Sequence, residues 1–178
     1  DRLKFINCRI LGNQDTIYTG AKFTRLYFKD CYIDGTTDFI FGPSTALFEN
    51  CMIHSKRNSY VTAASTPKEA KYGYIFKHCK LTAEPGVDKV YLGRPWRPYA
   101  YTLFIECELG KHIVPAGWHN WGKQSNEETA RYMEYKNTGE GANVSERVAW
   151  NKQLTKKEAE AVTVDAIFGT QSNWNPID

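Results

Sequence analysis

The sequence predicts an all-β fold, a parallel β-helix (a solenoid) with a short C-terminal helix and loops packed on it. Two observations predict this fold: each of the five cysteines lies in the same short sequence frame, and each frame contains a polar residue suited to a sharp corner. The 178 residues, 42% of them hydrophobic, are enough to bury a core and exclude a disordered tail. No apolar segment approaches the roughly 20 residues that a membrane-spanning helix needs.

The repeated frame reads Phe, any residue, a polar residue, Cys, any residue, and Ile or Leu. Within a frame, Cys and the following Ile or Leu lie two residues apart and share one face of a strand, whereas Phe points the other way. The polar residue before Cys is in most frames of a type that tolerates left-handed backbone. A corner at this residue turns both the Phe side chain before it and the Cys and Ile or Leu side chains after it inward. The frames are Phe5–Ile10, Phe28–Ile33, Phe48–Ile53, Phe76–Leu81 and Phe104–Leu109.

Two short strands that meet at a corner and recur along the chain are typical of stacked β coils, with Phe on Phe, Cys on Cys and Ile on Ile. The alternative is an antiparallel sandwich with coincidental cysteines. Because stacked coils lie about 4.8 Å apart, geometry allows a disulfide, for which Cys31 and Cys51 are the best candidates. Buried thiols acting as small hydrophobic groups are the preferred interpretation of the whole set.

Two carboxylates occupy equivalent positions on the first two coils. Asp15 follows Cys8, and Asp38 follows Cys31, by the same number of residues. If the coils are in register, their side chains lie roughly 5 Å apart, and two like charges so close resist joint ionisation. One carboxyl group then stays protonated while the other is charged, which suits an acid and a nucleophile. The alternative is that both are turn residues.

Aromatic residues and an arginine accompany these carboxylates. Tyr18, Phe39 and Phe41 form an aromatic rim that suits sugar rings, although aromatic residues in strands more often belong to a core. In the loop segment Tyr91–Arg97, Pro95 holds Arg94 in an extended conformation. Arg94 can then reach the ionised carboxylate, with Trp96 as a flat platform for a sugar; a surface arginine beside a core tryptophan is the alternative.

Three segments resemble, in order and spacing, signature motifs of the pectin methylesterases: Gly12–Tyr18, Gly35–Gly42 and Leu92–Trp96. The resemblance covers essentially the whole chain and continues through Pro115–Trp121, Tyr135–Gly139, Phe168–Gly169 and Trp174–Pro176. It implies a right-handed parallel β-helix that hydrolyses the methyl esters of polygalacturonate to free acid and methanol, without a metal or other cofactor.

The resemblance also implies roles for individual residues. The nucleophile of the family falls on Asp38, its general acid/base on Asp15, the arginine that orients the nucleophile on Arg94, and an oxyanion-hole glutamine on Gln14. Thr37 stands where the family more usually has valine. The residues expected to contact the substrate are Tyr18, Thr37, Phe41 and Trp96.

The family places a further motif, with a second oxyanion glutamine, upstream of the point where this sequence begins. We therefore expect residues 1–178 to be a single domain that lacks its N-terminal coils and corresponds to the C-terminal part of a catalytic domain. The expected partner is methyl-esterified pectin, bound by a monomer. Neither nucleic acid nor a membrane is expected as a partner, since the net charge is only +3 and no block of one sign occurs. Such a substrate implies secretion.

Two other functions fit the same features. A carboxylate pair about 5 Å apart also suits a retaining glycoside hydrolase that cuts polygalacturonate. A non-catalytic β-helix that binds pectin is the second alternative. The four histidines show no metal-ligand spacing and are expected at the surface or at corners: His54, His78, His112 and His119.

Outside the coils, local signals predict one helix and one loop. Thr155 to Glu158 form a capping box that begins a short helix through about Val162. The polar stretch Gly122–Thr129 is expected to be a loop.

Overall fold

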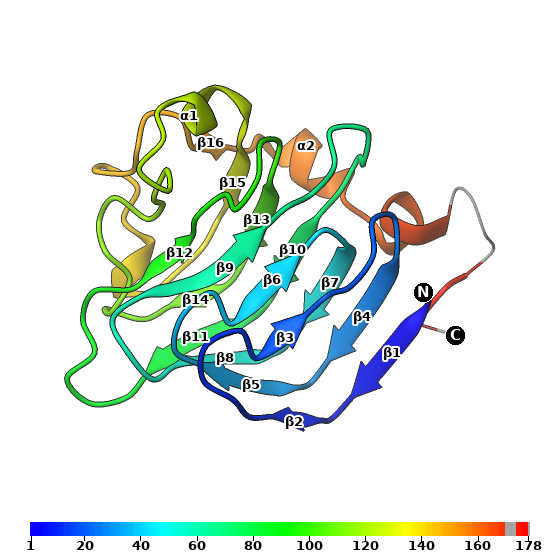
Figure 1. Cartoon of the computed structure of the whole chain (residues 1–178), viewed down its shortest axis with the longest axis horizontal. Helices are drawn as coiled ribbons and strands as arrows, with labels where there is room; N and C mark the ends of the chain where they lie inside the picture. Colours follow the sequence, from blue (N-terminus) through cyan, green and yellow to red (C-terminus); the bar gives the residue numbers. More distant parts are fainter. Residues whose placement is uncertain (170–173, 178) are drawn as a thin grey trace.

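The computed structural model describes residues 1–169 and 174–177, and its strands form three parallel sheets (Figure 1). Each of the first four coils places one strand in each sheet in turn, so the chain winds as a parallel β-helix, which confirms the predicted fold. The first sheet contains β1 (Leu3–Ile6), β4 (Arg25–Lys29), β7 (Thr45–Glu49), β10 (Tyr74–Lys77), β13 (Tyr101–Ile105), β15 (Arg131–Tyr135) and β16 (Lys152–Gln153). The second contains β2 (Arg9–Ile10), β5 (Tyr32–Gly35), β8 (Met52–Ser55), β11 (Lys80–Ala83) and β14 (Glu108–Leu109). The third contains β3 (Ile17–Tyr18), β6 (Ile40–Gly42), β9 (Tyr60–Ala64) and β12 (Tyr91–Gly93).

The corners between the first and second sheets lie where the repeated frame predicts them. The polar residue before each cysteine has a positive φ, for example 53° at Asp30 and 53° at Asn50. Left-handed backbone at this one position turns the chain, so that Phe before the corner and Cys after it both face inward. Five residues share this conformation in the five frames: Asn7, Asp30, Asn50, His78 and Glu106.

The core is built from columns of identical residues. Neighbouring phenylalanine rings of the frames are stacked, with centroids 4.6 Å apart for Phe28 and Phe48 and 4.4 Å apart for Phe76 and Phe104. All five cysteines are free thiols, and Cys31 and Cys51 are not bridged. Each buried thiol donates a hydrogen bond to the phenylalanine carbonyl of the preceding coil, as Cys79 does to Phe48 at 3.3 Å. Burial raises the pKa of Cys31 to about 11, which keeps this thiol protonated at neutral pH.

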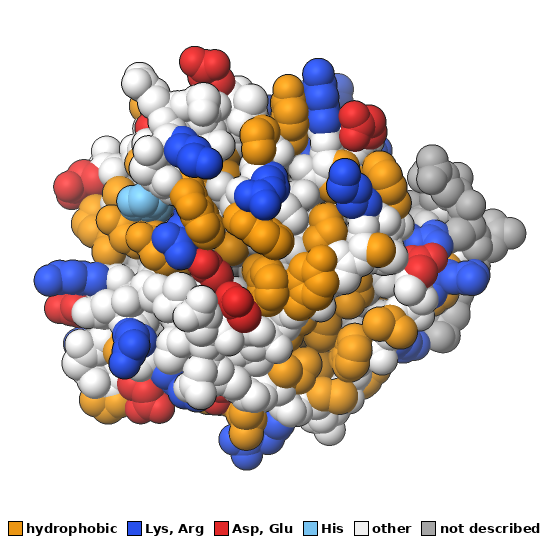
Figure 2. All heavy atoms as spheres, in the orientation of Figure 1, with side chains coloured by type: hydrophobic (Ala, Val, Ile, Leu, Met, Phe, Trp, Pro, Cys, Tyr) orange, Lys and Arg blue, Asp and Glu red, His pale blue; other side chains and the backbone are white. Residues whose placement is uncertain are grey.

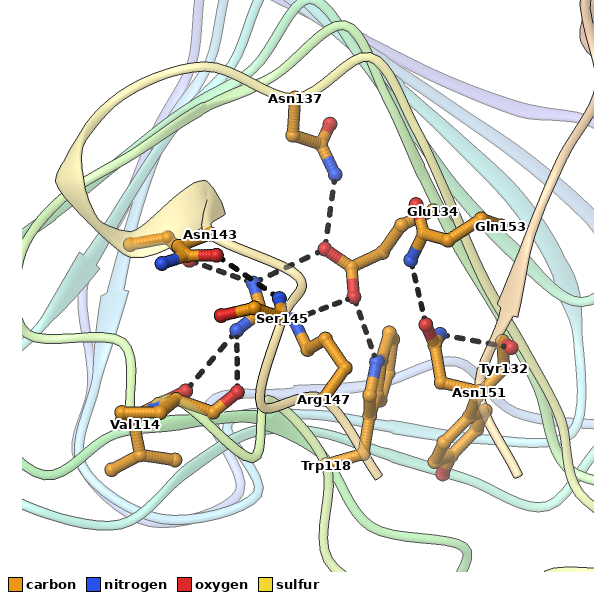
Figure 3. Close-up of polar contacts among 12 residues, drawn as sticks. Val114, Trp118, Tyr132, Glu134, Asn137, Asn143, Ser145, Arg147, Asn151 and Gln153 are labelled. Carbon is orange, nitrogen blue, oxygen red and sulfur yellow. Dashed lines mark hydrogen bonds and ion pairs between the residues drawn. The ribbon is translucent and has the colours of Figure 1, made fainter. Parts of the chain in front are cut away.

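A sixth corner, at Lys136, has no cysteine frame in the sequence. In the β13–β15 register, Glu134 pairs with Phe104, so a carboxylate continues the phenylalanine column. Glu134 is only 1% exposed, and the guanidinium of Arg147 binds its Oε1 at 2.9 Å and its Oε2 at 3.2 Å (Figure 3). Trp118 Nε1 also donates to Oε1 at 3.1 Å, and Asn137 Nδ2 to Oε2 at 3.3 Å. A buried carboxylate is tolerated here because both of its oxygens are fully hydrogen-bonded.

The C-terminal segment covers the outer face of the first sheet. α2 (Lys156–Glu160) begins at Thr155 with the predicted capping box, and it ends slightly before the predicted Val162. Ala159, Val162 and the π-helical η2 (Asp165–Gly169) pack on outward-facing residues of β4, β7, β10 and β13. Figure 1 shows α2 beside this sheet. A 3₁₀ turn, η1 (Glu140–Ala142), contacts β14.

Two expectations from the sequence are wrong. The stretch Gly122–Thr129 is not all loop, since α1 (Ser125–Thr129) forms there around buried Asn126, whose Nδ2 donates to Asn120 O at 3.0 Å. Phe39 does not join an aromatic rim, because its side chain is 0% exposed in the core. His112, expected at the surface or at a corner, lies in the turn after β14 and is 4% exposed. Burial and, second, the nearby His54 lower its pKa to about 4.

Within residues 1–169 and 174–177, no helix has the length and apolar character needed to cross a membrane. In the same residues, no cluster of three or more His, Cys, Asp or Glu side chains is arranged to hold a metal ion.

Candidate active site

The third sheet places the two predicted carboxylates side by side. Ile17 of β3 pairs with Ile40 of β6, and continuing this register back by two residues sets Asp15 opposite Asp38. The Asp15 N–H donates to Thr37 O at 3.1 Å across the two coils. Both aspartates have a positive φ, 58° for Asp15 and 49° for Asp38, a conformation that a short polar side chain tolerates better than most. The coil register therefore brings the carboxylates together, as the spacing predicts.

Arg94, directly after β12, binds Asp38. Its Nε donates to Oδ1 at 2.9 Å and its Nη2 to Oδ2 at 2.7 Å, so both carboxylate oxygens are held by one planar group. The Arg94 side chain is 21% exposed and that of Asp38 10%, so the pair is largely shielded from water. Asp15, on the neighbouring coil, is exposed.

Two aromatic rings hold the arginine. The Arg94 guanidinium carbon lies 3.9 Å from the ring centroid of Tyr60 and 3.8 Å from that of Trp121, so the planar group is enclosed between them. Tyr60 occupies the position after Asp38 in the same column, because Ile40 pairs with Thr62 and the Asp38 N–H donates to Tyr60 O at 2.9 Å. The column therefore consists of two carboxylates followed by an aromatic ring that supports Arg94, the partner of Asp38.

Asp15 differs from Asp38 in having no arginine partner among the residues that the structure describes. Partial burial, and second the negative charge of Asp38, raise the pKa of Asp15. A carboxyl group with a raised pKa keeps its proton to a higher pH and suits a general acid, whereas a carboxylate held by an arginine stays ionised. The pair therefore has the asymmetry of an acid and a nucleophile.

The other predicted residues surround this pair. Tyr18 and Phe41 are in contact, with centroids 4.9 Å apart, and Phe41 meets Trp96 edge-on at 5.9 Å. Thr37 Oγ1 accepts a hydrogen bond from Ser59 Oγ at 2.8 Å. The Gln14 side chain is exposed beside Asp15 and makes no hydrogen bond to the residues that the structure describes.

The aromatic row borders an open hollow of about 360 Å³. In Figure 2, acidic side chains at the centre of this face lie among hydrophobic side chains, with Lys and Arg around them. A second hollow, of about 420 Å³, lies against η2 and contains none of these residues. The first hollow is lined by Tyr18, Lys22, Pro43, Ser65, Thr66, Pro67, Trp96, Arg97 and Pro98.

The buried ion pair of the sixth coil supports the loop that carries Trp121. Arg147 Nη1 donates to the Pro115 carbonyl at 2.9 Å, and Glu134 accepts from the Trp118 indole (Figure 3). Trp118 in turn pairs with Gly93, the residue before Arg94. This network attaches segment 114–121 to β12 and so places the Trp121 ring against Arg94.

Sequence reasoning missed three residues of this site: Tyr60, His119 and Trp121. Tyr60 continues the column of Asp15 and Asp38. The two sheets advance by different numbers of residues at this coil, however, from Ile40 to Thr62 in the third sheet and from Phe28 to Phe48 in the cysteine frame. Counting from the cysteines therefore does not reach Tyr60. His119, expected at the surface or a corner, is half-buried beside Arg94, and burial and, second, the charge of Arg94 lower its pKa.

Known proteins resemble this chain both in sequence and in structure. The pectinesterase family profile matches residues 1–171. Pectinesterase 31 of Arabidopsis thaliana is 44% identical over 160 residues, which cover 89% of this chain and 50% of that protein. The pectin methylesterase from carrot superimposes with a TM-score of 0.84 at 35% identity, covering 91% of this chain and 55% of that one. A pectin methylesterase solved in complex with a hexasaccharide gives a TM-score of 0.80 at 30% identity, covering 98% of this chain and 59% of that one.

The chain thus spans about half the length of the curated relatives that it matches. The profile match, however, extends over nearly all of the chain and includes the coils that carry Asp15, Asp38 and Arg94, and the structural likeness to the carrot pectin methylesterase covers 91% of the chain. The chain belongs to the pectinesterase family.

Proposed function

We propose that this chain hydrolyses the methyl esters of pectin to free acid and methanol, with Asp38 as nucleophile and Asp15 as general acid and then base. The observation that carries the proposal is the asymmetry of the carboxylate pair: Arg94 binds both oxygens of Asp38, while the pKa of Asp15 is raised. Membership of the pectinesterase family supports the choice of ester and substrate.

In the proposed reaction, an Asp38 oxygen attacks the ester carbonyl carbon and Asp15 gives its proton to the departing methoxy oxygen. Methanol leaves, and the galacturonate acyl group is joined to Asp38 as an anhydride. Asp15, now ionised, takes a proton from water, whose oxygen attacks the acyl carbon and frees Asp38. The Gln14 amide donates to the carbonyl oxygen as negative charge develops there, a contribution of roughly 3 kcal/mol for one such donor.

The substrate is proposed to lie along the aromatic row. Tyr18, Phe41 and Trp96 offer apolar faces for sugar rings, and Thr37 lies between Asp38 and Ser59, close to the reacting groups. Lys22 and Arg97 in the adjoining hollow suit an acidic polysaccharide. A pectin-acting enzyme works outside the cell, so we also propose an extracellular, cell wall or periplasmic location.

Product analysis by proton NMR after incubation with highly methyl-esterified pectin tests the proposal. Methanol without new reducing ends is the expected result. Reducing ends without methanol would assign Asp15 and Asp38 to a glycoside hydrolase. A folded chain that forms neither product yet binds pectin would be a binding module, and the esterase proposal would then fail for this chain.

A further inference from the structure

His119 contacts the aromatic groups that hold Arg94, yet the proposed reaction gives it no role. Its ring meets Tyr60 and Tyr91 edge-on, with both centroid distances 5.4 Å. Its backbone N–H donates to Gly93 O at 3.1 Å, which attaches it to the residue before Arg94. His119 therefore lies at the junction of β9, β12 and the segment that carries Trp121.

The side chain of His119 also closes the turn that leads to Trp121. Its Nδ1 accepts the backbone N–H of Trp121 at 3.0 Å. Trp121 has a φ of 63°, a left-handed conformation that costs a bulky residue about 1–2 kcal/mol and persists only where other contacts impose it. The next side chain repeats the arrangement, since Asn120 Oδ1 accepts the N–H of Gly122 at 2.8 Å. Segment 119–122 is thus fixed by two successive side-chain acceptors.

The hydrogen bond determines the protonation state of the ring. A backbone N–H can only donate, so Nδ1 must carry a lone pair and the neutral imidazole must carry its proton on Nε2. Burial and, second, the charge of Arg94 both lower the pKa of His119. The titratable groups that face the ring are Tyr91 from β12, Arg94 directly after β12, and Tyr60 from β9, and no carboxylate pairs with it within residues 1–169 and 174–177.

We propose that His119 is a positioning residue: its neutral imidazole fixes the backbone of Trp121 so that the indole lies on Arg94, which holds the guanidinium in place for Asp38. The effect of His119 on turnover rests on the proposed esterase function, whereas its hydrogen bond to the Trp121 N–H does not. Protonation of Nδ1 would set one N–H against another and add a second cation beside Arg94. The contact between the Trp121 indole and Arg94 therefore loosens as the pH falls through the pKa of His119.

Two substitutions separate this role from simple packing. In His119→Asn, the Oδ1 can accept the N–H two residues ahead, as Asn120 already does, but the side chain does not titrate. In His119→Leu, the bulk is kept and the acceptor is lost. The asparagine variant is therefore a matched rescue control for the leucine variant, and thermal unfolding of both shows whether each is folded.

The first measurement follows the backbone amide of Trp121 and the ring of His119 by NMR as the pH is lowered. In the native chain the Trp121 amide should shift with the same midpoint as the His119 ring, and this midpoint should lie below that of an ordinary histidine. In His119→Asn the amide should show no such transition. A Trp121 amide that ignores the protonation of His119 would overturn the proposal, whether or not the chain is an esterase.

The second measurement is kcat and KM for methanol release from methyl-esterified pectin. His119→Leu should lower kcat by up to about 100-fold with KM little changed, because a small displacement of a positioned group has an effect of this size. His119→Asn should recover most of kcat. In this variant kcat should also lack the decrease at low pH that accompanies protonation of His119 in the native chain. Native kcat in a folded His119→Leu variant would also overturn the proposal. Absence of methanol from the native chain would instead refute the esterase function and leave the amide titration to decide on the turn.

Discussion

Arg94 binds both oxygens of the Asp38 carboxylate while its guanidinium lies between the rings of Tyr60 and Trp121. This combination requires a flat, delocalised cation with donors along one edge. Lysine has neither the plane nor the paired donors, although it carries the same charge.

Arg94→Lys should therefore impair methanol release even though the charge is conserved. We expect kcat to fall about 100-fold or more, the effect of losing a preorganised donor in other enzymes. Arg57→Lys, at an exposed arginine before β9, is the matched control and should behave as the native chain. Equal kcat values for the two variants would show that the two-point contact with Asp38 is unimportant.

The raised pKa of Asp15 predicts how activity depends on pH. Since partial burial and the charge of Asp38 disfavour the ionised form, Asp15 should keep its proton above the ordinary range, and activity should decline as the pH rises through its pKa. Asp38→Asn removes the second of these causes, so the pKa of Asp15 should fall toward its ordinary value. Carbon-13 NMR titration of the Asp15 carboxyl group in both proteins measures the change, and an identical midpoint would contradict the coupling.

The buried pair of Glu134 and Arg147 should make a large contribution to stability. Their side chains are 1% and 4% exposed, and Glu134→Ala leaves a buried arginine without its counter-charge. Breaking a pair of this kind costs about 3–5 kcal/mol, which urea unfolding can measure. Glu160→Ala, which breaks an exposed pair with Lys156, should change the free energy of unfolding by less than about 0.5 kcal/mol. Similar losses in the two variants would argue against the burial of the first pair as the cause.

The corner at Asn50 offers a test of the predicted coil geometry. Its φ is 53° and its side chain is exposed, so a substitution there acts mainly on the backbone. Asn50→Ala should destabilise the fold by about 1 kcal/mol because alanine resists left-handed backbone, whereas Asn50→Gly should come within a few tenths of the native value. Chemical unfolding of both variants is the measurement, and equal stability of the alanine and glycine forms would be inconsistent with a conformational role.

The repeated frame was sufficient to predict the coils because each Phe, Cys and Ile or Leu performs the same packing task in every turn. The prediction ended at the sixth coil, where Glu134 replaces the phenylalanine and Asn137 the cysteine. Nothing local in that segment reveals that Arg147 and Trp118 neutralise and bind the buried carboxylate. A pattern of apolar residues cannot identify a core position that is filled by a hydrogen-bonded charge.

The same distinction applies to the residues of the site. Asp15 and Asp38 could be found by counting because each follows the cysteine of its coil by the same number of residues, and Arg94, which binds Asp38, by its Gly-Arg-Pro context. Trp121 and His119 reach the site from an irregular segment whose path depends on hydrogen bonds to β12 and to the sixth coil. Their positions are determined by tertiary contacts, which spacing along the chain does not encode.

The coils keep their register although the connections between them differ greatly in length. Residues 43–44 join β6 to β7, whereas residues 65–73 join β9 to β10, yet Ala46 of β7 pairs with Tyr74 of β10 in the same ladder. Ser65, Thr66 and Pro67 of the longer connection line the hollow beside Trp96. Insertions at this rim can therefore reshape the hollow beside Trp96, where we propose that pectin binds, while the ladder beneath it is preserved. Substrate range and fold stability can thus evolve, or be engineered, at separate sites in the same coil.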